Sequence, residues 1–153
     1  MGETVALVDY GAGNLHSVEN ALRKVGAEVT VTADPDVLRS ADRIVLPGVG
    51  SFKACAEGLR AQAGAIEAMT ERVQVGGAPF LGICVGMQLL ATRGLEHGTT
   101  PGLDWIAGEV RAIEPIDASV KVPHMGWNDV ALTPHAEYDP VIETGEAYFL
   151  HSY

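Results

Sequence analysis

The sequence predicts an α/β protein with a mostly parallel sheet and helices on both of its faces. Short apolar runs alternate with segments of helical periodicity as far as Arg93. Hydrophobic residues make up 47% of the 153 residues and charged residues 20%, which is typical of a globular chain. Strands that alternate with helices are joined by right-handed crossovers, and such connections produce a parallel sheet covered on both sides.

The first strands and helices have clear boundary signals. Thr4–Val8 is predicted as a buried strand, and Asn14 is a favourable N-cap for a helix that Gly26 ends. Glu28–Thr32 alternates valine with polar residues, which predicts the second strand. Asp34-Pro35 then supplies an N-cap and a first-turn proline for a short helix.

Two more strands follow, separated by a helical stretch. Arg43–Leu46 is predicted as the third strand and Ala78–Ile83 as the fourth. Between them, Lys53–Val75 has helical periodicity, with a break expected near Gly64. After the fourth strand we expect a helix that runs to about Arg93.

The pattern changes from about Gly94 onward, where the helical period is lost. We interpret this part as an antiparallel extension, after about residue 105, of the same sheet domain, so that residues 1–153 form a single domain. Its expected short strands are Glu109–Ile113, Val120–Val122, Asn128–Leu132 and Ala147–Leu150.

The segment Gly82-Ile83-Cys84-Val85-Gly86 has the sequence of a nucleophile elbow, a sharp strand-to-helix turn that exposes one side chain. Glycines on either side remove side chains that would collide in such a turn. The N-terminus of the following helix would favour a Cys84 thiolate, and the Val85 N–H would stabilise an oxyanion. The alternative is a small buried cysteine in a glycine-rich turn.

Sites in parallel sheets form at the carboxyl ends of the strands, so three turns should converge there: Asp9–Asn14, Pro47–Phe52 and the Cys84 elbow. Backbone N–H groups at Val49 and Gly50 are candidates for the second wall of an oxyanion hole. The first turn resembles a dinucleotide fingerprint only superficially, because His16 stands where the third glycine is required.

Composition narrows the classes of partner and compartment. The 10 Lys and Arg residues against 20 Asp and Glu give a net charge of −10, which argues against nucleic acid and anionic membranes as partners. Two cysteines, Cys55 and Cys84, have no metal-like spacing, and no export signal is evident, so we expect a cytoplasmic protein without cofactor or metal. For Cys55 we expect only a packed helical thiol.

These segments together resemble the class I glutamine amidotransferases, and most closely the glutaminase-subunit family of imidazole glycerol phosphate synthase. The resemblance spans nearly the whole chain, and it implies a flavodoxin-like fold. The segments that carry it are Asp9–Val18, Leu46–Phe52, Gly82–Leu90, Val122–Asn128 and Tyr148–Tyr153.

The resemblance implies that Cys84 attacks the side-chain amide of L-glutamine, releases ammonia and forms a thioester that water hydrolyses. It implies oxyanion donors at Val49, Gly50 and Val85. It assigns substrate binding to Gln88, Glu96, Ser152 and Tyr153.

The resemblance also implies a partner that receives the ammonia. That partner is a (β/α)8-barrel cyclase subunit, which forms a heterodimer with the glutaminase and makes imidazole glycerol phosphate and AICAR in histidine biosynthesis. The residues implied at the interface are Gly11, Asn14, Pro123, Met125 and Trp127, although a packed core aromatic is the alternative for Trp127.

A thiol nucleophile needs a base, which the family supplies in a His-Pro-Glu segment that is not found in these 153 residues. We therefore expect the triad His and Glu to be missing by C-terminal truncation, and the chain alone to have negligible glutaminase activity. Two alternatives stay open: a partner-independent cysteine elbow hydrolase, and a non-catalytic binding subunit.

Overall fold

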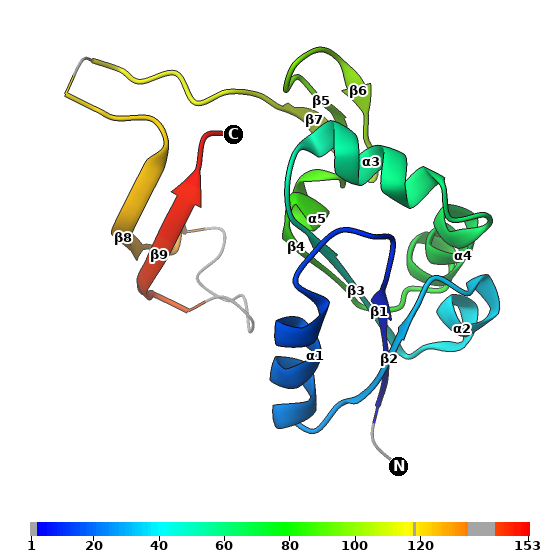
Figure 1. Ribbon diagram of the computed structural model, residues 1–153. Helices are drawn as coiled ribbons and strands as arrows, with labels where there is room; N and C mark the ends of the chain where they lie inside the picture. Colours follow the sequence, from blue (N-terminus) through cyan, green and yellow to red (C-terminus); the bar gives the residue numbers. More distant parts are fainter. Residues whose placement is uncertain (1–2, 118, 135–142) are drawn as a thin grey trace. The chain divides into compact units, whose positions relative to one another are not determined.

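A computed structural model describes residues 3–117, 119–134 and 143–153 (Figure 1). The internal contacts divide the chain into two compact units, Met1–Val110 and Arg111–Tyr153, which we call unit 1 and unit 2 and describe separately. The expectation of a single domain stays a prediction. Within the described ranges, no helix is long and apolar enough to cross a membrane.

Unit 1 is built on a four-stranded parallel sheet with the strand order β2-β1-β3-β4. The strands are β1 (Thr4–Val8), β2 (Glu28–Thr32), β3 (Arg43–Gly48) and β4 (Phe80–Cys84). This confirms the predicted parallel sheet. The order is that of a flavodoxin-like doubly wound fold, in which ligands bind beyond the carboxyl ends of the strands.

The helices of unit 1 cover both faces of this sheet (Figure 1). On β1, Val5 and Leu7 face one side with α1, whereas Ala6 and Val8 belong to the core on the other side. That alternation follows from the two-residue period of a strand. The helices are α1 (Leu15–Lys24), α2 (Pro35–Ser40), α3 (Phe52–Arg60), α4 (Ala65–Thr70), the π-helical turn η1 (Glu71–Val75) and α5 (Val85–Gln88).

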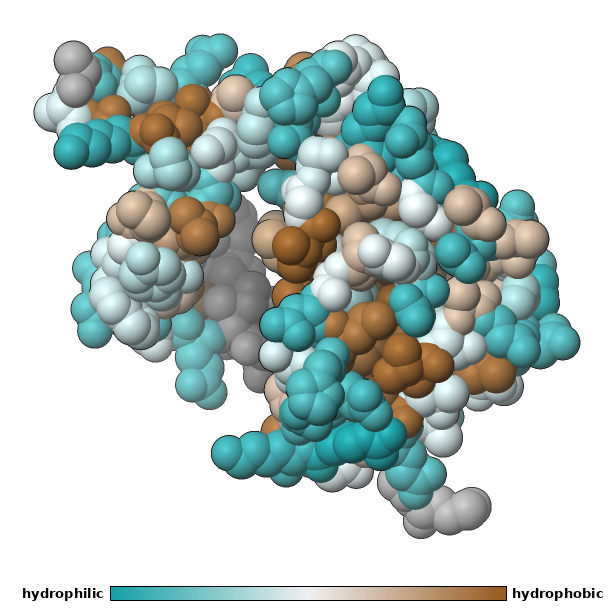
Figure 2. Space-filling model, viewed as in Figure 1, coloured by the Kyte–Doolittle hydropathy of each residue, from teal (hydrophilic) through white to brown (hydrophobic). Residues whose placement is uncertain are grey.

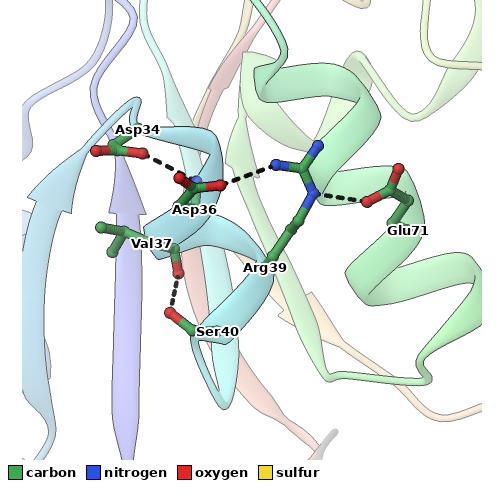
Figure 3. Close-up of polar contacts among 6 residues, drawn as sticks. All are labelled: Asp34, Asp36, Val37, Arg39, Ser40 and Glu71. Atoms are coloured by element: carbon green, nitrogen blue, oxygen red, sulfur yellow. Dashed lines mark hydrogen bonds and ion pairs between the residues drawn. The ribbon is translucent and has the colours of Figure 1, made fainter.

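Polar contacts around α2 tie it to η1 (Figure 3). The Asp34 side chain accepts a hydrogen bond from the Asp36 N–H at 2.9 Å, as the N-cap prediction requires. Arg39 donates from Nε to Glu71 Oε2 at 2.7 Å and from Nη1 to Asp36 Oδ1 at 3.3 Å. Both ion pairs are exposed, so they contribute little to the stability of the fold.

The predicted break of the long helical stretch is confirmed at Gly64. Its φ is +77°, and a Cβ there would lie 3.0 Å from Pro35 Cγ. Glycine takes this left-handed conformation without strain and leaves room for the proline ring. The chain therefore turns between α3 and α4.

A second, three-stranded sheet in unit 1 differs from the prediction. It has the order β6-β5-β7 and comprises β5 (Ala91–Gly94), β6 (Thr100–Pro101) and β7 (Ile106–Val110). β5 pairs antiparallel with β6 but parallel with β7, so the antiparallel extension predicted after about residue 105 is wrong for β7, whereas residues 124–130 and 145–151 pair antiparallel as expected.

The expected helix from the elbow to Arg93 is wrong, because α5 ends at Gln88. The carbonyls of Leu89 and Leu90 accept hydrogen bonds from the N–H groups of Leu103 and Trp105, at 2.7 and 3.0 Å. These carbonyls therefore accept hydrogen bonds from residues 103 and 105 instead of from the next turn of a helix.

Unit 2 contains the antiparallel pair β8 (His124–Val130) and β9 (Gly145–His151). The expected strand at Val120–Val122 is wrong. There the Asp117 side chain accepts from the Ser119 N–H at 2.7 Å and the Val120 N–H bonds to the Asp117 carbonyl at 3.3 Å, which makes a turn.

Candidate active site

Cys84 lies at the junction of β4 and α5 in the strained backbone conformation of an elbow. Its φ is 54° and its ψ is −119°, a region that residues other than glycine rarely adopt, and its side chain is exposed. A Cβ on Gly86 would lie 2.0 Å from the Leu46 carbonyl oxygen, and one on Gly82 would lie 2.6 Å from Met87 Cα. The elbow predicted from the sequence is therefore present, and exposure of Cys84 excludes the buried-cysteine alternative.

The helix that follows Cys84 has only four residues, Val85–Gln88, so its macrodipole is weaker than that of the predicted longer helix. Local donors remain, because the first N–H groups of a helix have no partner within it. Val85 is the first helical residue after the nucleophile. The predicted use of its N–H in an oxyanion hole stays a prediction.

The Pro47–Phe52 turn, which we call the oxyanion loop, begins directly beside the elbow. Gly48 is the register partner of Cys84 in the β3–β4 pair. A Cβ on Gly48 would lie 2.4 Å from the Gly86 nitrogen, so the two turns are in backbone contact. Gly50, farther along, has a φ of +108°. The predicted convergence of these two turns is confirmed, whereas the role of Val49 and Gly50 as oxyanion donors is not tested.

Two buried polar side chains contact the oxyanion loop. The Tyr10 hydroxyl donates to the Pro47 carbonyl at 2.6 Å, and the Cys55 thiol donates to the Val49 carbonyl at 3.5 Å. Burial raises the pKa of the Tyr10 phenol and of the Cys55 thiol above their ordinary values. Cys55 is packed on α3, as expected, but its contact with Val49 was not predicted.

Sequence reasoning missed both contacts. The available signals were the position of Tyr10 two residues after the predicted strand Thr4–Val8 and of Cys55 near the start of the predicted helical stretch. Neither signal shows that α3 folds against the loop.

Two of the four predicted substrate-binding residues lie in unit 1. Gln88 is half-buried at the end of α5, four residues after Cys84 in the chain. Glu96 follows β5 and accepts a hydrogen bond from the Phe52 N–H at the start of α3, at 2.8 Å. Glu96 is therefore beside the oxyanion loop.

The other two substrate-binding candidates, Ser152 and Tyr153, follow β9 in unit 2. The Ser152 carbonyl accepts from the Ile113 N–H at 2.8 Å, and the Tyr153 carbonyl lies 2.9 Å from His151 Nδ1. The substrate roles of all four residues stay predictions.

Of the residues predicted at a partner interface, Gly11 and Asn14 lie in unit 1. Gly11 has a φ of +83°, and the Asn14 side chain caps α1 by accepting from the Ser17 N–H at 3.3 Å. Together with Val49 and Gly58 they line an open cavity of about 550 Å³ at the carboxyl end of the sheet.

Pro123, Met125 and Trp127, the remaining interface candidates, lie immediately before or within β8. Met125 pairs with Leu150 and Trp127 pairs with Tyr148, so these four side chains share one face of the hairpin. The exposed fraction is 64% for Met125 and 71% for Trp127. Figure 2 shows brown, hydrophobic groups among teal, hydrophilic ones on the visible side of this hairpin. The alternative of Trp127 as a packed core aromatic is therefore wrong.

The histidines and acidic groups are the remaining candidates for a base or a metal ligand. In unit 1, His16 Nε2 lies 3.0 Å from Asn20 Nδ2 on α1, and His97 is exposed in the turn after β5. In unit 2, His124 Nδ1 lies 3.1 Å from His151 Nε2, whereas His135 lies outside the described residues. The described part of the chain contains no group of three or more His, Cys, Asp or Glu side chains that could hold a metal ion.

A cysteine elbow at the carboxyl edge of a flavodoxin-like parallel sheet defines the class of protein. The family model of class I glutamine amidotransferases matches residues 6–153, and the chain belongs to that family. A solved glutamine amidotransferase shares the fold, with a TM-score of 0.69 at 18% identity over 95% of this chain and 70% of that one.

More similar relatives identify the branch of the family. Imidazole glycerol phosphate synthase subunit HisH of Caulobacter vibrioides is 51% identical over 99% of this chain and 74% of its own length. HisH of Zymomonas mobilis is 54% identical over 98% of this chain and 71% of its own length. The chain belongs with these subunits, which makes it a glutaminase of histidine biosynthesis.

Proposed function

We propose that Cys84 forms the thioester through which L-glutamine is hydrolysed to glutamate and ammonia. The His-Pro-Glu base is not found in these 153 residues, so we expect negligible activity from them alone. The observation that supports this mechanism best is the exposed Cys84 at positive φ, held between glycines that cannot carry a Cβ. The geometry presents the sulfur at the carboxyl edge of the sheet while the surrounding backbone remains close-packed. A nucleophile presented in this way suits acyl transfer.

In the first step, the Cys84 sulfur forms a bond to the side-chain carbonyl carbon of glutamine, and the carbonyl oxygen becomes an oxyanion. Backbone N–H groups of Val85 and of the Val49–Gly50 segment stabilise that charge. When the oxyanion collapses, the carbon–nitrogen bond breaks, and the nitrogen takes up the proton that the Cys84 thiol has lost and leaves as ammonia. Water then hydrolyses the thioester to glutamate and the free thiol.

Substrate recognition falls to Gln88, Glu96, Ser152 and Tyr153 in this proposal. A carboxylate such as that of Glu96 suits the α-ammonium group of a free amino acid. Its position beside the oxyanion loop, through the bond to the Phe52 N–H, supports this role. A cytoplasmic location fits the reaction, because the thiol of Cys84 must stay reduced.

The ammonia passes to a (β/α)8-barrel cyclase subunit, which forms imidazole glycerol phosphate and AICAR. We propose that Gly11 and Asn14 on unit 1, and Pro123, Met125 and Trp127 on unit 2, contact this partner in a heterodimer. Exposed aromatic and methionine side chains are enriched in protein interfaces, and one face of the β8–β9 hairpin displays three of them, Met125, Trp127 and Tyr148, beside the exposed Leu150.

A chloroketone analogue of glutamine tests the nucleophile and the substrate together, because binding where glutamine binds accelerates its alkylation of the cysteine there. We expect one adduct per chain, located on Cys84 by peptide mass mapping and slowed by added L-glutamine. Cys84→Ala should abolish the adduct. The matched control is the corresponding analogue of asparagine, one methylene shorter, which should react far more slowly.

The same experiment separates the alternatives. A partner-independent hydrolase with another substrate would label without protection by glutamine. A non-catalytic binding subunit would bind the cyclase partner equally well with and without Cys84, and would not react with the glutamine analogue. Either result would overturn the proposed function.

A further inference from the structure

The proposed mechanism uses N–H groups of the oxyanion loop but leaves two buried polar side chains without a role. Tyr10 follows β1 and Cys55 lies on α3, and they are 3% and 0% exposed. Each donates a hydrogen bond to a backbone carbonyl of the loop, Tyr10 to Pro47 and Cys55 to Val49. Side chains from two separate elements thus bind the loop at alternate peptide groups.

Tyr10 is held firmly in its own position. Its hydroxyl lies 2.6 Å from the Pro47 carbonyl oxygen, a short hydrogen bond. A Cβ on Gly58 would lie 2.9 Å from the Tyr10 carbonyl oxygen, so α3 packs directly on the Tyr10 backbone. Since burial raises the pKa of the phenol, it remains a donor at neutral pH.

Cys55 makes the corresponding contact two residues farther along the loop. Its Sγ lies 3.5 Å from the Val49 carbonyl oxygen. A thiol is a weak donor, but a thiolate could not donate at all. Because burial raises the pKa of Cys55, the group stays protonated and the hydrogen bond is kept.

The orientation of these carbonyls determines the orientation of the neighbouring N–H groups. In a planar trans peptide the C=O and the N–H point in opposite directions. The Val49 carbonyl points toward the buried Cys55 sulfur, so the Gly50 N–H points away from it. The Pro47 carbonyl points toward the Tyr10 hydroxyl, so the Gly48 N–H points away from that hydroxyl. Rotation of either peptide would break a buried hydrogen bond.

We propose that Tyr10 and Cys55 are positioning residues that hold the backbone of the oxyanion loop in the orientation needed for acyl transfer to Cys84. This inference rests on the proposed function. It assigns to Cys55 a role in catalysis through Val49, in place of simple packing in the core. Gly48, the second residue of the loop, is the register partner of Cys84, so a small rotation there displaces donors next to the nucleophile.

The test compares two reactions of Cys84 that differ in their need for an oxyanion hole. Acylation by the γ-(p-nitrophenyl) ester of glutamate forms a carbon–sulfur bond, breaks the carbon–oxygen bond and releases nitrophenolate through a tetrahedral oxyanion. Nitrophenolate leaves without a general acid. Alkylation by iodoacetamide displaces iodide at a saturated carbon and forms no oxyanion. The ratio of the acylation rate to the alkylation rate therefore measures stabilisation of the oxyanion, because a change in the reactivity of the thiol affects both rates.

The variants are Tyr10→Phe and Cys55→Ala, which remove the donors, and Cys55→Ser, which keeps one in nearly the same volume. Removal of an oxyanion-hole donor costs about 100-fold to 1,000-fold, and a misplaced donor should cost less, so we expect acylation to fall about tenfold in Tyr10→Phe and Cys55→Ala. Alkylation should stay within about twofold, and Cys55→Ser should recover most of the acylation rate.

Other results would contradict either the positioning role or the proposed function. Acylation at the parent rate in both Tyr10→Phe and Cys55→Ala overturns the positioning role, as does a parallel fall of acylation and alkylation. If Cys55→Ala fails to fold, Tyr10→Phe and Cys55→Ser carry the comparison. A parent chain that iodoacetamide alkylates at Cys84 but that the ester does not acylate overturns the proposed function, and this inference with it.

Discussion

The close packing around the elbow makes Gly86→Ala the substitution whose effect can best be derived from the structure. The new Cβ would lie 2.0 Å from the Leu46 carbonyl oxygen and 3.0 Å from the Pro47 carbonyl carbon. All of the nearest atoms belong to the backbone of β3, a central strand, so none can move away as a flexible side chain would. The strand and the elbow must separate by more than about 1 Å to restore ordinary contact.

Forced overpacking of this kind typically costs about 1–3 kcal/mol, and a backbone clash belongs at the upper end of that range. For a chain of this size each kcal/mol lowers the melting temperature by about 2–4 °C, so we expect a loss of about 6–12 °C. Cys84 should also lose its reactivity toward the glutamine analogue, since its strained φ depends on the same packing.

The assay is thermal unfolding followed by circular dichroism, with Gly145→Ala as the matched control. A Cβ on Gly145 would meet no atom within 4 Å, and the φ of this residue is not positive, so its substitution should leave the melting temperature within about 2 °C. A Gly86→Ala protein that melts with the parent would refute the claim that this glycine is required by contact with β3.

Three further predictions concern capping, pH and the partner. Asp34→Ala removes the N-cap of α2 and should cost about 1 kcal/mol, measured by chemical denaturation, with no effect on Cys84 labelling. Burial raises the pKa of Cys55 above its ordinary value of 9.0, so the unfolded chain loses this proton first. The free energy of unfolding should therefore fall as the pH rises above about 9, and less steeply in Cys55→Ser; equal slopes would contradict the burial argument. Trp127→Ala should weaken binding of the cyclase subunit by about 2 kcal/mol or more, about 30-fold in calorimetry, whereas Val25→Ala, at an exposed position on unit 1, should not.

The sequence predicted the structure correctly where the interactions that determine it join residues close together in the chain. β1 and β2 have the predicted bounds, because β1 is a short continuous apolar run and β2 alternates valine with polar residues, each between polar turns. Asn14 and Asp34 cap their helices as predicted, since an N-cap bond spans only two or three residues. The elbow was predicted because its glycines and its cysteine are adjacent in the chain.

The sequence predicted the structure poorly where contacts between residues far apart in the chain determine it. Ala91–Gly94 lacks apolar alternation, and it becomes a strand because it pairs with β6 and β7, which lie later in the chain. The contact of Glu96 with the Phe52 N–H joins residues 44 positions apart. The hydrogen bond from Tyr10 to Pro47 likewise joins separate elements, and only the folded sheet brings them together.

The predicted sites divide in the same way. Cys84, the oxyanion loop and Glu96 belong to one unit, and the structure places them around neighbouring turns. Ser152, Tyr153 and the β8–β9 hairpin belong to unit 2, where the sequence motif predicts their roles and the structure describes only their local contacts.

The central claim is that Cys84 carries the γ-glutamyl group during glutamine hydrolysis. The most direct measurement mixes the chain and its cyclase subunit with L-glutamine, quenches in acid and determines intact and peptide masses. The account predicts one added γ-glutamyl group on the peptide that contains Cys84, with none in Cys84→Ala. A γ-glutamyl group on another residue, or glutamine turnover that persists in Cys84→Ala, would contradict it.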